Sequence, residues 1–115
     1  MKLTYQQLIL TALKYDELRQ LKLPVAQLLR LRQAMKFLSE QISLFDEVRK
    51  EVVAKYNLAD EKERERADQE LMEALQQTVE FPNFEPIPIR YLEGQTLSLD
   101  FIEKTDWLWE FDESA

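Results

Sequence analysis

Apolar residues recur at alternating steps of three and four through the middle of the chain. The residues that follow this spacing are Leu28, Leu31, Met35, Leu38, Ile42, Phe45, Val52 and Tyr56. The pattern predicts one long helix with a single apolar stripe, from about residue 24 to about residue 56. At about 1.5 Å per residue such a helix is roughly 50 Å long. We expect its stripe to meet another helix or another subunit, because a domain of this size cannot cover it alone.

The stripe is the candidate subunit interface of an oligomer. The residues assigned to this interface are Leu31, Met35, Leu38, Ile42, Phe45 and Val52. Arg49 interrupts the stripe, where a cation is costly if it is buried alone. Either Arg49 reaches the edge of the stripe and pairs with Asp46 or Glu51, or it fixes the register or the oligomeric state.

Two shorter helices are predicted beside the long one. Thr4 and Gln7 have the spacing of a capping box, which predicts that a first helix starts there and continues to about Leu18. Asp60 and Glu63 form another N-cap signature, before a third helix that ends near residue 78. We expect this third helix to fold back on the long helix as a hairpin.

The pattern changes after residue 78. Alternating apolar residues, interrupted by three prolines, predict a small hairpin or two extended edges up to Tyr91. Gly94, the sole glycine, fits a turn with positive φ, and Ser98 is predicted to cap a short last helix. The chain then ends in aromatic and acidic residues.

These elements predict a mainly α fold in a single domain, residues 1–115. Residues 1–78 form a long helical hairpin of three helices. Residues 79–115 form a small extended or β-hairpin part, a short last helix and an acidic aromatic tail. A content of 45% apolar and 32% charged residues is typical of a folded, soluble chain.

The aromatic tail has two interpretations. If it is exposed, Trp107, Trp109 and Phe111 form a docking peptide for a partner protein. In the other interpretation Trp107, Leu108 and Phe111 pack on the helical hairpin and close its core, because a small chain seldom leaves so much aromatic surface in water.

Residues that carry chemistry are scarce. Without cysteine or histidine the chain forms no disulfide and lacks the usual zinc, haem and thiol ligands, and one glycine cannot build a phosphate loop. Glu61, Glu65, Asp68 and Glu73 are interpreted as a solvated helix face and not as a metal site. We therefore expect no enzyme activity, no catalytic or metal site and no cofactor.

The net charge of −7 is distributed unevenly. Residues 1–36 carry seven Lys and Arg against two acids, and residues 37–115 carry eight against twenty. The charges either belong to solvated faces, steer an antiparallel pairing of subunits or attract a basic partner. The basic cluster around the first interhelical turn contains Arg19, Lys22, Arg30, Arg32 and Lys36. Nucleic-acid binding by this cluster is disfavoured, because the chain is acidic overall and the next helix is too long for a helix-turn-helix reader.

Short segments of cap, turn and stripe residues are spread over nearly the whole chain, at 1–4, 7–8, 20–24, 45–49, 54–56, 60–62, 75–81, 92–94 and 97–98. In these segments the layout of the chain resembles a family of small phage and prophage proteins of uncharacterised function. The resemblance implies a phage or prophage origin and a helical hairpin with a small C-terminal extended part, but no catalytic residue. The cluster from Trp107 to Phe111 departs from the family pattern.

We therefore expect a non-enzymatic helical interaction protein, an oligomeric adaptor or accessory factor of a phage or prophage. Its partner is a second copy or another phage or host protein. The alternative is an inhibitor or nucleic-acid-linked regulator that acts through its acidic surface or its basic N-terminal corner. No predicted segment is long and apolar enough to cross a membrane, so the host cytoplasm is the expected location.

Overall fold

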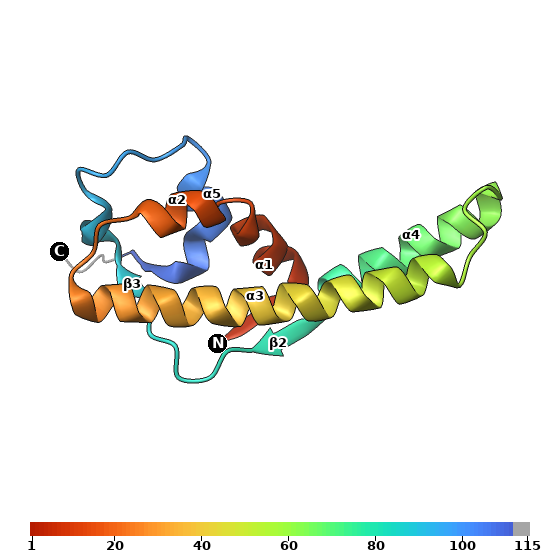
Figure 1. Cartoon of the computed structure of the whole chain (residues 1–115), viewed down its shortest axis with the longest axis horizontal. Coiled ribbons are helices and arrows are strands. Elements are labelled where there is room, and N and C mark those ends of the chain that lie inside the picture. The colour runs from red at the N-terminus through yellow and green to blue at the C-terminus, as the bar shows by residue number, and fades with distance from the viewer. Residues whose placement is uncertain (112–115) are drawn as a thin grey trace.

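The computed structural model describes residues 1–111 and confirms the mainly α fold. Its elements in chain order are β1 (Lys2–Thr4), α1 (Tyr5–Ala12), α2 (Tyr15–Gln20), α3 (Val25–Ala54), α4 (Glu61–Gln76), β2 (Thr78–Glu80), β3 (Ile87–Pro88), the 3-10 helix η1 (Ile89–Leu92), α5 (Phe101–Thr105), the 3-10 helix η2 (Asp106–Leu108) and β4 (Trp109–Glu110). The molecule measures 54 × 29 × 25 Å and is elongated because α3 runs along most of its length (Figure 1).

The predicted capping box at the start of α1 is confirmed. The Thr4 hydroxyl accepts from the Gln7 N–H at 3.1 Å, and the Gln7 side chain accepts from the Thr4 N–H at 2.8 Å. The predicted first helix is, however, divided into α1 and α2. Leu8 and Leu18 lie on either side of the break, and both enter the same core.

The long helix α3 is confirmed, and α4 folds back along its second half as predicted. Asp60 caps α4 by accepting from the Lys62 N–H at 2.9 Å. The distal parts of α3 (residues 46–54) and α4 (residues 61–70) project from the rest of the molecule as a two-helix arm (Figure 1). Val52 and Ala67 are the buried apolar residues of this arm. The arm is therefore held together by a small core of its own.

The extended segments pair differently from a hairpin. β2 pairs antiparallel with β1, with Leu3 opposite Val79, and β3 pairs parallel with β4, with Ile87 opposite Trp109. The hairpin alternative is wrong. The two separate extended edges are correct for β2 and β3, whereas Ile89 and Tyr91, which were included in the second edge, lie in η1. Leu3 and Ile87 both enter the main core, so each strand takes the partner that buries its apolar side chain.

Two predictions for the following loop had different outcomes. Gly94 has φ of 77°, which confirms the turn with positive φ. Ser98 does not cap the last helix, because α5 begins after Asp100. The Ser98 hydroxyl and N–H instead donate to the Glu17 carboxylate at 2.6 and 2.9 Å, which ties the loop to α2.

The C-terminal segment closes the main core over α1 and α3. Trp107, Leu108 and Trp109 are all buried there. The indole N–H of Trp107 donates to the Thr11 hydroxyl at 2.7 Å, and that of Trp109 donates to the Thr105 hydroxyl at 2.9 Å. Two large rings therefore enter the core without leaving a buried donor unpaired.

Candidate interaction surface

Most of the residues predicted to form a subunit interface are buried within the single chain. Leu31, Met35 and Leu38 lie in the main core, and Val52 is buried in the arm. Ile42 packs against the main core and Phe45 stacks on Tyr5 with ring centroids 5.7 Å apart, but both are only partly buried. Within the single chain, four of the six predicted interface residues are therefore not accessible to a second copy.

Arg49 lies outside the buried stripe. Its guanidinium donates to the Asp46 carboxylate at 2.7 Å, and both side chains are about half exposed. The hydrogen bond from Arg49 is the largest cause that lowers the pKa of Asp46, and a hydrogen bond from Lys50 lowers it further. This is the predicted pairing at the edge of the stripe, so Arg49 avoids burial as an unpaired cation.

The three candidate docking residues of the tail have different surroundings. Trp107 and Trp109 are only 8% and 3% exposed. The interpretation that places Trp107 in the core is confirmed, and Trp109 is buried although that interpretation did not include it. Phe111 is 46% exposed, so its predicted place in the core is wrong, and it is the one of the three that a partner could reach without rearrangement.

An apolar hollow of about 190 Å³ lies beside the root of the arm. Its lining comes from α1, α3, α4 and the residue after α4: Tyr5, Leu44, Phe45, Val48, Ala74 and Gln77. Leu44 and Val48 are 48% and 39% exposed although both are large and apolar. The surface between α3 and α4 is therefore unusually apolar for a part of the molecule that faces solvent.

Acidic residues surround the exposed apolar side chains. Glu40 and Glu47 lie one turn before and after Leu44 on α3, and Glu51 lies one turn after Val48. All three glutamates are exposed, and none forms an ion pair within residues 1–111. A complementary surface would be apolar at its centre and basic at its border.

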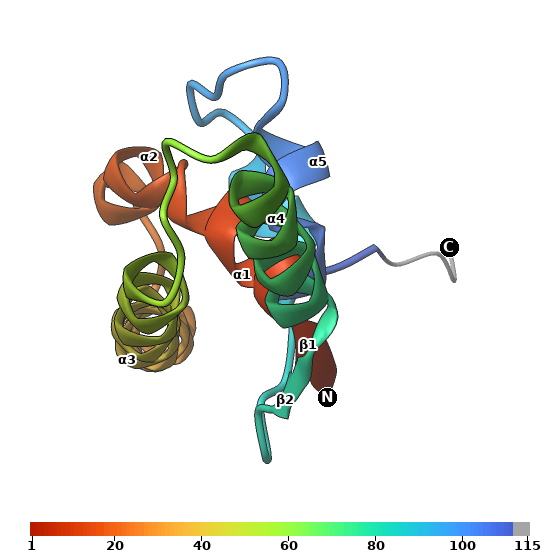
Figure 2. The same cartoon turned by 90° about the vertical axis from the view of Figure 1, so that its right-hand side faces the viewer.

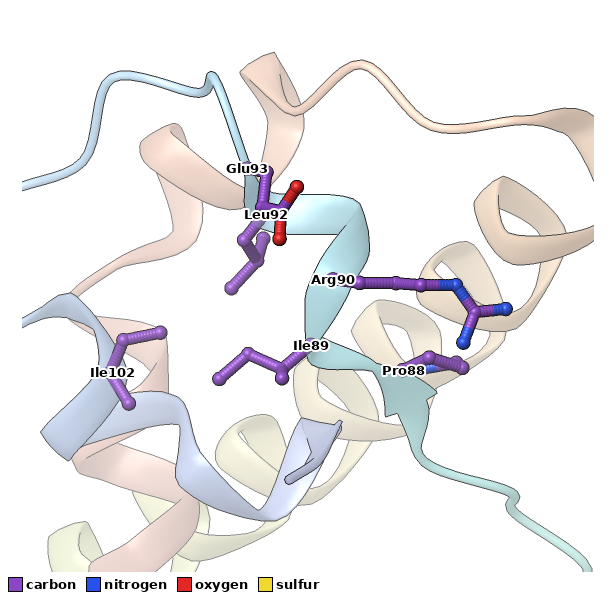
Figure 3. A pocket seen from close by; sticks show the side chains of 6 residues that line it. All are labelled: Pro88, Ile89, Arg90, Leu92, Glu93 and Ile102. Atoms are coloured by element: carbon purple, nitrogen blue, oxygen red, sulfur yellow. The ribbon is translucent and has the colours of Figure 1, made fainter. Parts of the chain in front are cut away.

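A second hollow, of about 510 Å³, lies next to η1. Figure 3 shows Ile89, Leu92 and Ile102 around a shared space, while the Arg90 side chain points away from it. The Arg90 guanidinium lies 5.0 Å from the centre of the Tyr91 ring. Besides Arg90, Glu93 is the charged residue that lines this hollow, so it lacks the several convergent polar groups of a specific ligand site.

The densest polar cluster joins α1 and α2 to α5. Lys14 pairs with Asp100 and Glu17, and Lys104 also reaches Asp100 at 3.4 Å. The Lys14 ammonium lowers the pKa of Asp100 to about 2, and the hydrogen bonds from Ser98 lower the pKa of Glu17. Asp100 in turn raises the pKa of Lys14. Every shift favours the charged form, so near neutral pH these groups act as an ionic clasp rather than as proton donors or acceptors.

The carboxylates considered for metal binding all lie on α4. Within the part of the chain that the structure describes, no group of three or more potential ligands is placed to hold a metal ion. None of the described helices combines the length and apolar character needed to cross a membrane. Comparisons with protein-family models, curated proteins and solved structures gave no match.

The sequence pattern missed Leu44 and Val48 because they lie beside the stripe. The two residues are one helical turn apart, so they share a flank of α3 that the steps of three and four leave out. The sequence does show Leu44 and Val48 as an apolar pair four residues apart, next to Glu47 and Glu51. Whether this pair is exposed or buried depends on where α4 lies, which the pattern does not specify.

Proposed function

We propose that the chain is a non-enzymatic helical interaction protein of the phage or prophage type, an adaptor or accessory factor that acts in the cytoplasm of the host cell. The observation that carries the proposal is the apolar hollow beside the arm. Leu44 and Val48 contribute large apolar side chains that the rest of the chain leaves exposed. Contact with another protein chain would remove this apolar surface from water.

The shape of the molecule supports this role. The arm projects from the main core (Figure 1). The hollow lies at its root, where a partner could contact α3 and α4 together. Because its lining side chains come mainly from α1, α3 and α4, the surface exists before binding and little ordering is required. The ionic clasp around Asp100 lies on another part of the chain and takes no part in the proposed contact at the hollow.

Site-specific photo-crosslinking in producing cells tests the proposal. A photoreactive amino acid replaces Leu44 in one protein and Met72 in a control protein. Met72 is also apolar and is 65% exposed, but it does not line the hollow. We expect discrete adducts of defined mass from position 44 and none of the same mass from position 72.

A second change gives the same experiment an internal check. Val48→Glu places a charge at the edge of the hollow and should abolish the adduct at position 44 while the protein stays folded, because Val48 is partly exposed. Absence of an adduct at position 44, or identical adducts at both positions, would overturn the proposal.

The alternative role as an inhibitor or nucleic-acid-linked regulator has one supporting observation. Arg19, Lys22, Arg32 and Lys36 are exposed and form no ion pair with another described residue. Arg30 of the same cluster is paired with Glu85 at 3.2 Å. A phosphate-binding role would give affinity for nucleic acid that falls steeply with salt, which contact through the apolar hollow would not.

A further inference from the structure

Among residues 1–111, one side of α3 carries no other element along most of its length, and Leu44 lies at the edge of this side, next to the hollow. At about 100° per residue, Leu29, Gln33, Lys36, Glu40 and Leu44 fall within about 80° of one another, and we call them the outer face of α3. Lys36 and Glu40 are exposed, and Leu29 and Leu44 are 61% and 48% exposed. Figure 2, which looks along the helix, shows α3 with one whole side free of neighbouring elements.

The outer face has opposite charges in its two halves. Lys36 belongs to the half that begins at Leu29, and Glu40 to the half that ends at Leu44. Glu47, one turn beyond Leu44, extends the acidic half, while Arg49 and Lys50 are directed to Asp46. Neither Lys36 nor Glu40 pairs with another charge among residues 1–111.

The apolar residues are placed almost symmetrically about the level of residue 38, midway between Lys36 and Glu40. Leu29 lies nine residues before this level and Leu44 six residues after it, about 22 Å apart along the helix axis. Reversing the helix about this level places Lys36 of one copy opposite Glu40 of the other and brings Leu29 to within about 4.5 Å of Leu44, measured along the axis. The face is therefore complementary to itself in an antiparallel arrangement.

We propose that the outer face of α3 binds the outer face of a second copy, with the two helices antiparallel. Leu29 of each copy packs beside Leu44 of the other. Each Lys36 lies opposite Glu40 of the other copy, and the two Lys36 side chains are about 6 Å apart along the helix axis. This inference rests on the proposed function, because it names the partner that covers Leu44.

Charge exchange tests this pairing. Lys36→Glu and Glu40→Lys each place like charges across the axis, so each protein alone should associate at least about tenfold more weakly than the wild type. In an equimolar mixture of the two variants, a dimer with one copy of each has opposite charges at every contact across the axis. Association should therefore return in the mixture. Light scattering on a sizing column reports twice the chain mass of 13.8 kDa for the wild type and the mixture.

Matched variants on α4 control for general attraction between oppositely charged proteins. Arg64→Glu and Glu65→Lys change the net charge by the same amounts at exposed positions of the arm. Each should remain as dimeric as the wild type, and mixing them should add nothing. A wild-type protein that keeps the mass of one chain at every concentration overturns the pairing. The pairing is also overturned if association increases equally in both mixtures. It is overturned too if the mixture of the Lys36→Glu and Glu40→Lys proteins shows no recovery.

Failure of the pairing is distinguishable from failure of the proposed function. A monomeric protein whose position 44 still forms an adduct with a different protein excludes the second copy and retains the interaction role. A monomeric protein that forms no adduct at position 44 overturns both the pairing and the proposed function. An adduct of twice the chain mass, together with recovery in the mixture, supports both.

Discussion

Thr11 connects three segments that are distant in the sequence. Its hydroxyl accepts from the Trp107 indole N–H at 2.7 Å and lies 2.9 and 2.8 Å from the carbonyl oxygens of Gln7 and Lys104. Thr11 itself is fully buried. One hydroxyl therefore makes it possible to bury an indole ring that would otherwise bring an unpaired donor into the core.

Thr11→Val should lower the free energy of unfolding by about 1–3 kcal/mol. The replacement has nearly the same shape but leaves the Trp107 N–H without an acceptor. Urea denaturation measures the loss. Thr78→Val, at an exposed position of β2, is the control and should stay within about 0.5 kcal/mol of the wild type. Equal effects of the two substitutions would show that the hydroxyl of Thr11 contributes little.

At the level of elements, local signals predicted the helices and their caps well. Thr4 and Asp60 cap the helices that they were expected to cap, and α3 extends from Val25 to Ala54, close to the expected bounds. These features depend on residues a few positions apart. Ser98 was misassigned because its partner, Glu17, is 81 positions away, and a local pattern cannot include such a partner.

The site was harder to predict than the fold for the same reason. The stripe with Leu31 and Leu38 is a correct prediction of burial, but the pattern does not show that α1 and β3 are among the elements that contact α3. The apolar character of Leu44 could be read from the sequence. Its exposure could not, because it follows from α4 ending beside it and leaving a hollow.

Leu38→Ala should cost about 2–5 kcal/mol of stability, because Leu38 is almost fully buried between α3 and the rest of the core. Thermal or chemical denaturation of the purified protein measures this cost. The matched control is Leu13→Ala, since Leu13 is 66% exposed between α1 and α2 and should tolerate truncation. A comparable loss at both positions would contradict the assignment of the stripe to the core.

At the scale of the whole molecule, the arm and the main core differ in how much apolar surface holds them. The main core contains fourteen buried apolar residues, whereas the arm contributes Val52 and Ala67. Parts of a protein with few buried contacts open locally at a lower cost than the global unfolding free energy. α3 belongs to both parts, so its two halves should differ in protection although they form one helix.

Native-state hydrogen exchange should reveal this difference. Amides of α3 in residues 46–54 should exchange faster than those in residues 31–42, which pack on the main core. The comparison within one helix needs no second protein, since intrinsic rates are corrected residue by residue. Uniform protection along α3 would mean that the arm opens only when the whole molecule unfolds.

The order of the segments along the chain also determines when the core can close during synthesis. Leu38 is made well before Trp109, and a ribosome that adds about 5–20 residues per second needs roughly 4–14 s to go from one to the other. Throughout that interval the stripe of α3 has α1 beside it but lacks the aromatic segment that completes the core. A chaperone that binds apolar segments would therefore find more apolar surface on the growing chain than on the finished protein.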